Sequence, residues 1–258
     1  MQTGAYLNTE YLGFYLDENI HSPTKHKKIR QAINYGFDRV KMIRYLKNGI
    51  GTPALNGFIP KGLPSFNKQK GYDYQPKKAK KLIQTYVQET GVKKPKIIIT
   101  TNGNYLDICE YVQRELQKIG LEVAIEVLPP STLRQGKANG KLSIFRASWI
   151  ADYPDAENYI SLFYSKNFAP NGPNYTHFKN EVFDELYEQS IQTTILSERY
   201  KLYQKMDSII IDEAPIVPLY YDEVIRFTQK NIDGLGVNPI DLLQVKRVRK
   251  TTNELQLE

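Results

Sequence analysis

An arginine, a tryptophan and an aspartate stand close together in the middle of the chain, at Arg146, Trp149 and Asp152. The planar guanidinium of an arginine matches a carboxylate, and the carboxylate of an aspartate matches an ammonium group. Because six positions separate Arg146 from Asp152, an extended backbone would hold the two charges roughly 20 Å apart. That is the scale of a short extended peptide, which has one positive and one negative end.

Two other interpretations of this segment stay open on the residues alone. The charges could be ordinary surface groups at the end of a strand. The carboxylates of Asp152, Asp155 and Glu157 could also be the acid pair of a glycoside hydrolase. Carboxylates this close to a proline turn more often cap the helix that follows, so we expect no catalysis.

The elements that must position these residues follow from the apolar patterns. Apolar alternation from Leu142 to Phe145 predicts a strand that delivers the following side chains to a cleft. Other strands are expected at 6–16, 96–101, 121–128 and 216–221. Helices are expected at 24–47, 76–91, 105–119, around Leu133, near 159–164, and at 180–192 and 197–212. Strands separated by helices predict an α/β or α+β chain with a mixed sheet.

The composition is that of a globular protein with a real core, since 41% of the 258 residues are hydrophobic and 24% are charged. No stretch approaches the ~20 apolar residues that a membrane helix needs. The first residues have neither a basic nor an apolar region, so we expect no signal peptide there. Apolar residues near both ends have no evident partner element, which suggests a piece of something larger.

The net charge of +7 comes largely from lysine clusters near 25–28, 77–81 and 93–96. These clusters are typical of solvated faces and lack interleaved aromatic residues, so we expect no nucleic-acid partner. The single cysteine, Cys109, permits no internal disulfide and is expected to be a small buried hydrophobe. The three histidines lack the spacing of a metal site, and we expect neither a metal nor a cofactor.

Eight motifs, in this order along the chain, resemble the oligopeptide- and dipeptide-binding family of extracytoplasmic solute-binding proteins of ABC transporters, known as family 5. The most recognisable is the helix sequence IRQAINYGFDR from Ile29 to Arg39. The others lie at Thr3–Gly4 with Tyr11–Phe14, at Gly51–Ala54 with Ile59–Gly62, and at Gly71–Lys80, Trp149–Asp155, Phe183–Asp184, Arg199–Tyr203 and Ala214–Tyr220. Any one of these motifs is weak evidence, but eight in the family order are strong evidence.

The resemblance implies a type II periplasmic-binding-protein fold of which only the C-terminal lobe is present. That lobe would span residues 1–222, with hinge strands near 10–16 and 218–224. The tail, residues 223–258, would return to an N-terminal lobe. The family's ligand is an extended peptide held between two lobes, and its partners are the permease subunits of an importer outside the cytoplasmic membrane. Contact with the membrane would be indirect, and we expect a monomer.

The resemblance also assigns roles to individual residues. Asp152 would bind the α-ammonium group of the peptide, and Trp149 would line a side-chain pocket. Ser148 and Ile150 would offer backbone hydrogen bonds. Arg146 would lie near the far end of the peptide and attract its carboxylate. Members of this family also bind nickel chelates, haem, glutathione, murein peptides or oligosaccharides, so a non-peptide ligand is the alternative.

Overall fold

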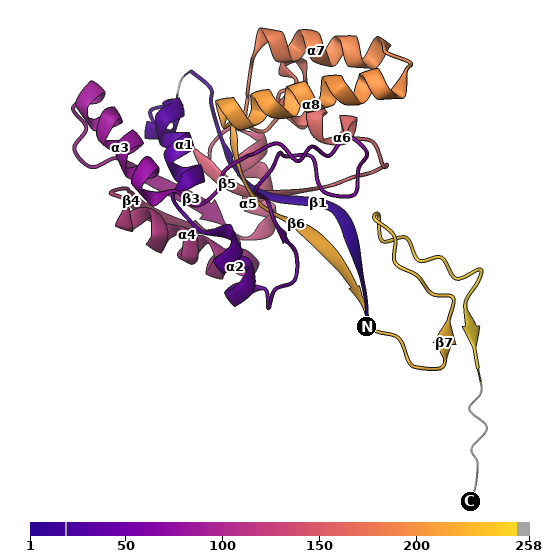
Figure 1. Cartoon of the computed structure of the whole chain (residues 1–258). Helices are drawn as coiled ribbons and strands as arrows, with labels where there is room; N and C mark the ends of the chain where they lie inside the picture. The colour runs from indigo at the N-terminus through magenta and orange to yellow at the C-terminus, as the bar shows by residue number, and fades with distance from the viewer. Residues whose placement is uncertain (19, 252–258) are drawn as a thin grey trace, which may run out of the picture.

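The computed structural model describes residues 1–18 and 20–251. Six strands form one mixed sheet at the centre of the molecule (Figure 1). In order across the sheet, they are β2 (Thr52–Pro53), β6 (Ile216–Arg226), β1 (Gln2–Phe14), β5 (Ile144–Ile150), β3 (Lys96–Thr101) and β4 (Glu122–Val127). Strand β1 is antiparallel to both of its neighbours, whereas β3 is parallel to β4 and β5. The predicted α/β chain with a mixed sheet is confirmed.

Helices cover both faces of this sheet. Four of them pack on one face, namely α1 (Lys27–Tyr35), α2 (Arg39–Leu46), α3 (Pro76–Thr90) and α4 (Leu106–Lys118). The other face carries α5 (Pro130–Ala138), α6 (Glu157–Ile160), α7 (Glu181–Gln192) and α8 (Leu196–Glu213). Period-2 alternation divides each strand between the two cores: Tyr11 and Phe145 face α5–α8, while Leu12 and Ile144 face α1–α4.

The single helix predicted over residues 24–47 is wrong. A short 3₁₀ turn at Pro23–Lys25 comes first, α1 ends at Gly36, and α2 begins after Asp38. The Asp38 carboxylate accepts hydrogen bonds from the backbone N–H groups of Val40 and Lys41 at 2.9 and 3.1 Å. This N-cap starts a second helix in a new direction. Val40, which the single-helix prediction placed on the apolar stripe, is 53% exposed as a result.

The remaining predicted helices and strands lie within a few residues of the observed ones. Helix α3 begins with Pro76 and ends at Gly91, whose φ of +75° is the left-handed conformation of a helix C-terminus. Cys109 is buried in α4, as expected. The aperiodic stretch 49–64 contributes only the two-residue strand β2.

Helix α8 orders this long loop through a buried carboxylate. Oδ1 of Asp207 accepts the backbone N–H of Phe58 at 2.7 Å, and Tyr221 donates its hydroxyl to the carbonyl of Gly57 at 2.6 Å. Asp207 is fully buried, and among the described residues its Oδ2 has no hydrogen-bond partner. Burial raises the pKa of this carboxyl to about 7, and backbone hydrogen bonds from the loop oppose the shift. Any side chain at Gly57 would collide with Asp207.

A second buried charge fixes the start of α2 to the sheet. The Arg39 side chain donates to the carbonyls of Pro218, Asn34 and Tyr72 at 2.6, 2.8 and 3.3 Å. It is 1% exposed, and burial lowers its pKa to about 9. Carbonyl oxygens therefore satisfy a charge that water cannot reach.

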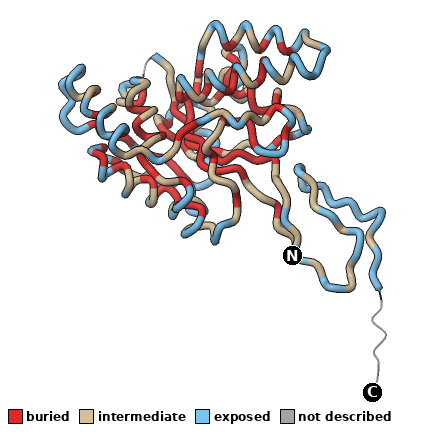
Figure 2. The backbone as a smooth tube through the Cα atoms, in the orientation of Figure 1, coloured by how far each residue is buried: buried red, intermediate tan, exposed pale blue. Residues whose placement is uncertain are grey.

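Strands β1 and β6 extend beyond the other strands as a two-stranded ribbon. Residues 2–5 pair with residues 223–226, away from the helices (Figure 1). The chain then continues through β7 (Ile232–Asp233) and β8 (Arg249–Lys250). It touches the ribbon where the carbonyl of Pro239 accepts the N–H of Leu7 at 2.7 Å. Most of this segment is exposed (Figure 2). The last part of the predicted tail, residues 252–258, lies outside the described residues.

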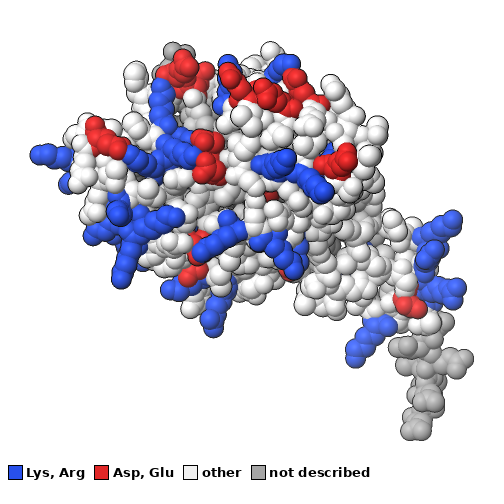
Figure 3. Space-filling model, turned by 45° about the horizontal axis from the view of Figure 1, so that its top comes forward, with Lys and Arg blue, Asp and Glu red and all other residues white. Residues whose placement is uncertain are grey.

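The charged side chains are unevenly distributed over the surface. Acidic groups gather at the end of the molecule that carries α7, whose charged residues are all acidic, whereas lysines and arginines spread over the side that carries α1–α4 (Figure 3). The lysines of the 77–81 cluster are exposed, as predicted for a solvated face. Of the helices that the structure describes, none is both long and apolar enough to span a membrane.

Candidate functional site

Strand β5, which carries Arg146 to Ile150, has one edge that is largely unpaired. Its hydrogen bonds to β1 involve the odd-numbered residues, since Tyr15 N–H bonds to Ser143 and Ala151 N–H bonds to Leu7. The even-numbered backbone groups therefore point to the opposite edge. On that edge β3 pairs only with Ile144 and Phe145. The backbone groups of Ser148 and Ile150 thus face an edge that no described strand occupies.

Side-chain alternation divides the predicted residues between the two faces of the sheet. Arg146, Ser148 and Ile150 lie on the α1–α4 face, opposite Leu12, Glu10 and Asn8 of β1. Trp149 lies on the other face and packs against the α5–α8 core. Ile150 is 47% exposed, and Ser148 is half-buried.

Asn158 at the start of α6 holds Trp149 and Asp152 together. Its side-chain oxygen accepts the indole N–H of Trp149 at 2.9 Å and the backbone N–H of Asp152 at 3.2 Å. Asn158 is 3% exposed, so neither bond competes with bulk water. The Asp152 carboxylate itself is exposed and has no hydrogen bond to any other described residue. The backbone of Asp152 is therefore held in place, while its carboxylate is open to solvent.

Asp155 has a structural role. One carboxylate oxygen accepts the backbone N–H of Glu157 at the start of α6 at 2.9 Å. The other forms an ion pair with Arg199 of α8 at 2.5 Å. The helix-capping interpretation of this acidic group is confirmed for Asp155. Of the proposed Asp152–Asp155 acid pair, Asp155 is already bound by Arg199.

Arg146 already has a carboxylate partner in the chain. Its guanidinium forms an ion pair with Glu10 of β1 and lies 3.2 Å from the ring centre of Tyr105. The side chains of Arg146 and Glu10 are 11% and 3% exposed. Burial raises the pKa of the Glu10 carboxyl, and the charge of Arg146 and a hydrogen bond from Asn8 oppose that rise.

Further polar groups continue this arrangement toward β6. The amide of Asn8 donates to Glu10 at 3.1 Å and to Asp222 at 3.4 Å. Asp222 lies 3.7 Å from the ammonium of Lys47, which sits 4.4 Å from the ring centre of Tyr220. We call these residues the polar cluster: Asn8, Glu10, Lys47, Tyr105, Arg146, Tyr220 and Asp222.

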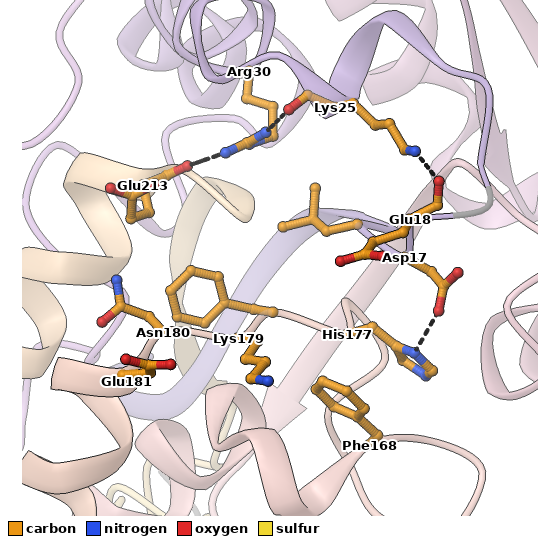
Figure 4. A pocket seen from close by; sticks show the side chains of 12 residues that line it. Asp17, Glu18, Lys25, Arg30, Phe168, His177, Lys179, Asn180, Glu181 and Glu213 are labelled. Atoms are coloured by element: carbon orange, nitrogen blue, oxygen red, sulfur yellow. Dashed lines mark hydrogen bonds and ion pairs between the residues drawn. The ribbon is translucent and has the colours of Figure 1, made fainter.

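A hollow of about 720 Å³ lies at the opposite end of β1 from Asp152 (Figure 4). It begins at Leu16, just beyond the pairing of Phe14 with Ile144, whereas Asp152 follows the other end of β5. Several of its charged side chains are bound within the chain: Arg30 donates to backbone carbonyls of Lys25 and Glu213, Lys25 donates to the carbonyl of Glu18, and His177 lies 3.7 Å from Asp17. The hollow is therefore separate from the site on β5.

Sequence patterns did not identify Glu10, Tyr105 or Asn158. Glu10 had one available signal, because it is the only charged residue in the predicted strand Tyr6–Leu16. Its partner lies 136 positions away, so only the strand pairing could reveal what it binds. Asn158 lies in a short segment without a distinctive motif.

Comparison with known proteins identifies the family. Residues 1–171 match the family described as bacterial extracellular solute-binding proteins, family 5, middle domain. Two curated relatives are the glutathione-binding protein GsiB of Escherichia coli and heme-binding protein A of Haemophilus influenzae. GsiB is 24% identical over 233 residues, covering 87% of this chain and 45% of its own length. Heme-binding protein A is 28% identical over 218 residues, covering 83% of this chain and 39% of its own length.

Solved structures of similar proteins share the fold. HbpA2 from Haemophilus parasuis has a TM-score of 0.85 at 21% identity, covering 97% of this chain and 49% of its own. DppA from Helicobacter pylori in complex with the peptide STSA has a TM-score of 0.82 at 24% identity, covering 97% of this chain and 48% of its own. The chain thus spans about half the length of these relatives and neighbours. It belongs to the family 5 bacterial extracellular solute-binding proteins.

Proposed function

We propose that the chain is the ligand-binding second lobe of a peptide importer's solute-binding protein, and that it binds an extended peptide along the free edge of β5. The observation that carries this proposal is the juxtaposition of that edge with the exposed carboxylate of Asp152. A strand edge offers main-chain hydrogen bonds to a peptide of almost any sequence. The nearby carboxylate offers a fixed partner for an α-ammonium group.

The order of the residues sets the direction of the peptide. With its amino end at Asp152 and its carboxyl end toward Arg146, the peptide runs antiparallel to β5. Backbone groups of Ser148 and Ile150 bond to its main chain, and Trp149, held by Asn158, lines a side-chain pocket. Affinity then comes mostly from the main chain and the amino terminus, which permits a broad range of peptide sequences.

The binding site is completed by a second lobe that this chain does not contain. We place the connection between lobes at the β1–β6 ribbon, residues 2–5 and 223–226, because residues 10–14 and 218–222 lie in the sheet interior. The tail after the ribbon returns to the other lobe. This accounts for Phe227, Leu243 and Val245, which are 79%, 65% and 62% exposed. Closure of the lobes excludes water and strengthens the ion pair at Asp152.

Membership of the family supports the remaining parts of this proposal. The protein acts outside the cytoplasmic membrane, as a monomer that delivers its ligand to ABC permease subunits. It binds and releases its ligand without chemical change, so it is no enzyme.

A non-peptide ligand is the second candidate, favoured by the names of the relatives that bind glutathione and haem. Mass spectrometry of the ligand that co-purifies with the protein distinguishes these candidates. A ligand without a free amine, such as haem, a nickel chelate or an oligosaccharide, would leave Asp152 without its partner.

The deciding experiment is calorimetric titration of unblocked and N-acetylated alanine peptides into the complete natural protein that contains this sequence. Asp152→Asn should weaken binding of the unblocked peptide by about a hundredfold, because it removes a charge-assisted contact with the ammonium group. The same change should leave binding of the acetylated peptide within about twofold of the parent protein. Glu122→Gln is the matched control, since it removes a carboxylate from the distant edge strand β4.

Two results contradict the proposal. One is unchanged affinity for the unblocked peptide in Asp152→Asn. The other is an equal loss for blocked and unblocked peptides, which would mean that Asp152 supports the fold of the site without binding the amino terminus.

A further inference from the structure

We infer that Glu10 is a specificity-determining residue: its carboxylate occupies Arg146 where the carboxylate of a short ligand would bind, so the site favours ligands whose main chain continues past Arg146. The inference rests on the proposed function, since it concerns which peptides the free edge of β5 accepts. Arg146 then lines the site with its charge already paired by Glu10, so that charge is not available to the ligand.

The pairing of the two strands holds Glu10 and Arg146 close together. Glu10 lies directly opposite Ser148, two residues from Arg146, in the β1–β5 register. Both side chains therefore lie on the same face and one ladder step apart. The ring of Tyr105 covers the guanidinium from another direction. The ion pair is thus built into the sheet before any ligand arrives.

A ligand carboxylate would have to displace Glu10 at high cost. The Glu10 side chain is 3% exposed, so it cannot reach water when it loses its partner. Removing one partner of a buried ion pair leaves an uncompensated buried charge. The free-energy cost of that charge exceeds the stabilisation that the intact pair provides. Replacing the Glu10 carboxylate by a ligand carboxylate gains one ion pair and leaves Glu10 buried without a cationic partner, with only the hydrogen bond from Asn8.

The neighbouring charges cannot compensate for that loss. The polar cluster holds two cations, Arg146 and Lys47, and two carboxylates, Glu10 and Asp222. Lys47 is already near Asp222. Lys137 of α5 lies on the opposite face of the sheet, 4.7 Å from the ring centre of Tyr175. A ligand carboxylate would therefore give this part of the site a net negative charge.

The expected ligand class follows from this charge balance. At the strand rise of ~3.4 Å per residue, the path from Asp152 to Arg146 accommodates about five or six extended residues. Peptides that end along this path would place a carboxylate beside the Glu10–Arg146 pair. Peptides that are longer, or that carry an uncharged end there, avoid this repulsion.

The test compares free-acid and amidated alanine peptides of about three to eight residues, titrated calorimetrically into the complete natural protein and its variants. In the parent protein, each acid should bind no more than about twofold better than its amide. In Glu10→Gln, the guanidinium of Arg146 is free. The free-acid peptide whose carboxyl end reaches Arg146 should then bind about tenfold better than the amide of the same length. Binding of the longest peptides should change little.

Two further variants separate specificity from a general effect on the fold. Adding Arg146→Met to Glu10→Gln should abolish the preference for the acid, because the freed cation is gone. Glu126→Gln removes one negative charge from the edge strand β4, where the carboxylate accepts a hydrogen bond from Thr100 at 3.0 Å. It should leave the ratio of acid to amide affinity at the parent value. Thermal unfolding of each variant confirms that the compared proteins are folded.

The outcomes are distinct. An acid preference of about tenfold or more in the parent protein that disappears in Arg146→Met would overturn the inference, since Arg146 would be open to ligands despite Glu10. The inference would also be overturned if amidation changed peptide affinity by the same factor in Glu10→Gln as in the parent protein. That result would leave the proposed function intact. Failure of every alanine peptide to bind would remove the proposed function, and the inference with it.

Discussion

Replacing the buried Asp207 by asparagine should remove a large part of the pH dependence of stability. Burial raises the pKa of this carboxyl from 3.8 to about 7 in the folded chain. A difference of about three pKa units corresponds to about 4 kcal/mol of folding free energy. In the window between these values the folded state holds more protons than the unfolded state. The contribution of Asp207 therefore lowers stability progressively as the pH rises from about 4 to about 7.

Asparagine preserves the shape of the site and removes the titration. Its carbonyl oxygen can still accept the N–H of Phe58, which now bonds to Oδ1 of Asp207 at 2.7 Å. The new NH₂ group would replace Oδ2, which has no partner among the described residues. An unpaired buried N–H costs about 1–3 kcal/mol at every pH. At about pH 8 the variant should thus be more stable than the parent by roughly 1–3 kcal/mol, and near pH 4 it should be less stable.

Urea unfolding at a series of pH values measures this effect. The chain has a single tryptophan, Trp149, half-buried beside Asn158, so its fluorescence reports unfolding of the lobe. Asp212→Asn is the matched control on the same helix, because this aspartate is exposed and pairs with Lys27 at the surface. Parallel stability curves for the parent and Asp207→Asn between about pH 4 and pH 7 would refute the reasoning.

Two further predictions concern buried polar side chains. Arg39→Met should destabilise the chain by about 3–5 kcal/mol in urea unfolding, because three carbonyls lose a buried donor; a loss below about 1 kcal/mol would contradict the assigned role. Asn158→Ala should cost about 1–3 kcal/mol and shift Trp149 fluorescence to longer wavelength, because the indole N–H loses its acceptor. An unchanged spectrum would mean that other contacts hold the indole, and Asn104→Ala in an exposed turn is the control.

Local signals in the sequence predicted most of the fold. Proline at the start of α3 and glycine after its end gave that helix its bounds, and apolar alternation located the start of β5. The prediction of a single long helix was wrong because the apolar stripe continues across Gly36 and Asp38 in the sequence. A glycine followed by an N-cap aspartate is a local signal for two helices, and it outweighed the periodicity.

The candidate site was only partly predictable, for a physical reason. Trp149, Asp152 and the strand before them are close in sequence, and a motif could identify them. The partner of Arg146 is set by the register of β1 against β5, which joins residues 136 positions apart. Such a register depends on the tertiary packing of both faces. The sequence therefore predicted that the charge of Arg146 is available to a ligand. In the structure, Arg146 forms an ion pair with Glu10.

The order of the strands has a consequence for how this lobe is made. Strands β1 and β6 are neighbours in the sheet but come from opposite ends of the described sheet-forming sequence, residues 2–14 and 216–226. Until β6 has emerged from the ribosome, β1 lacks one neighbour and β2 has no partner at all. Contacts of such long sequence separation form slowly and late. The lobe should therefore acquire protease resistance in one late step, when β6 joins the sheet.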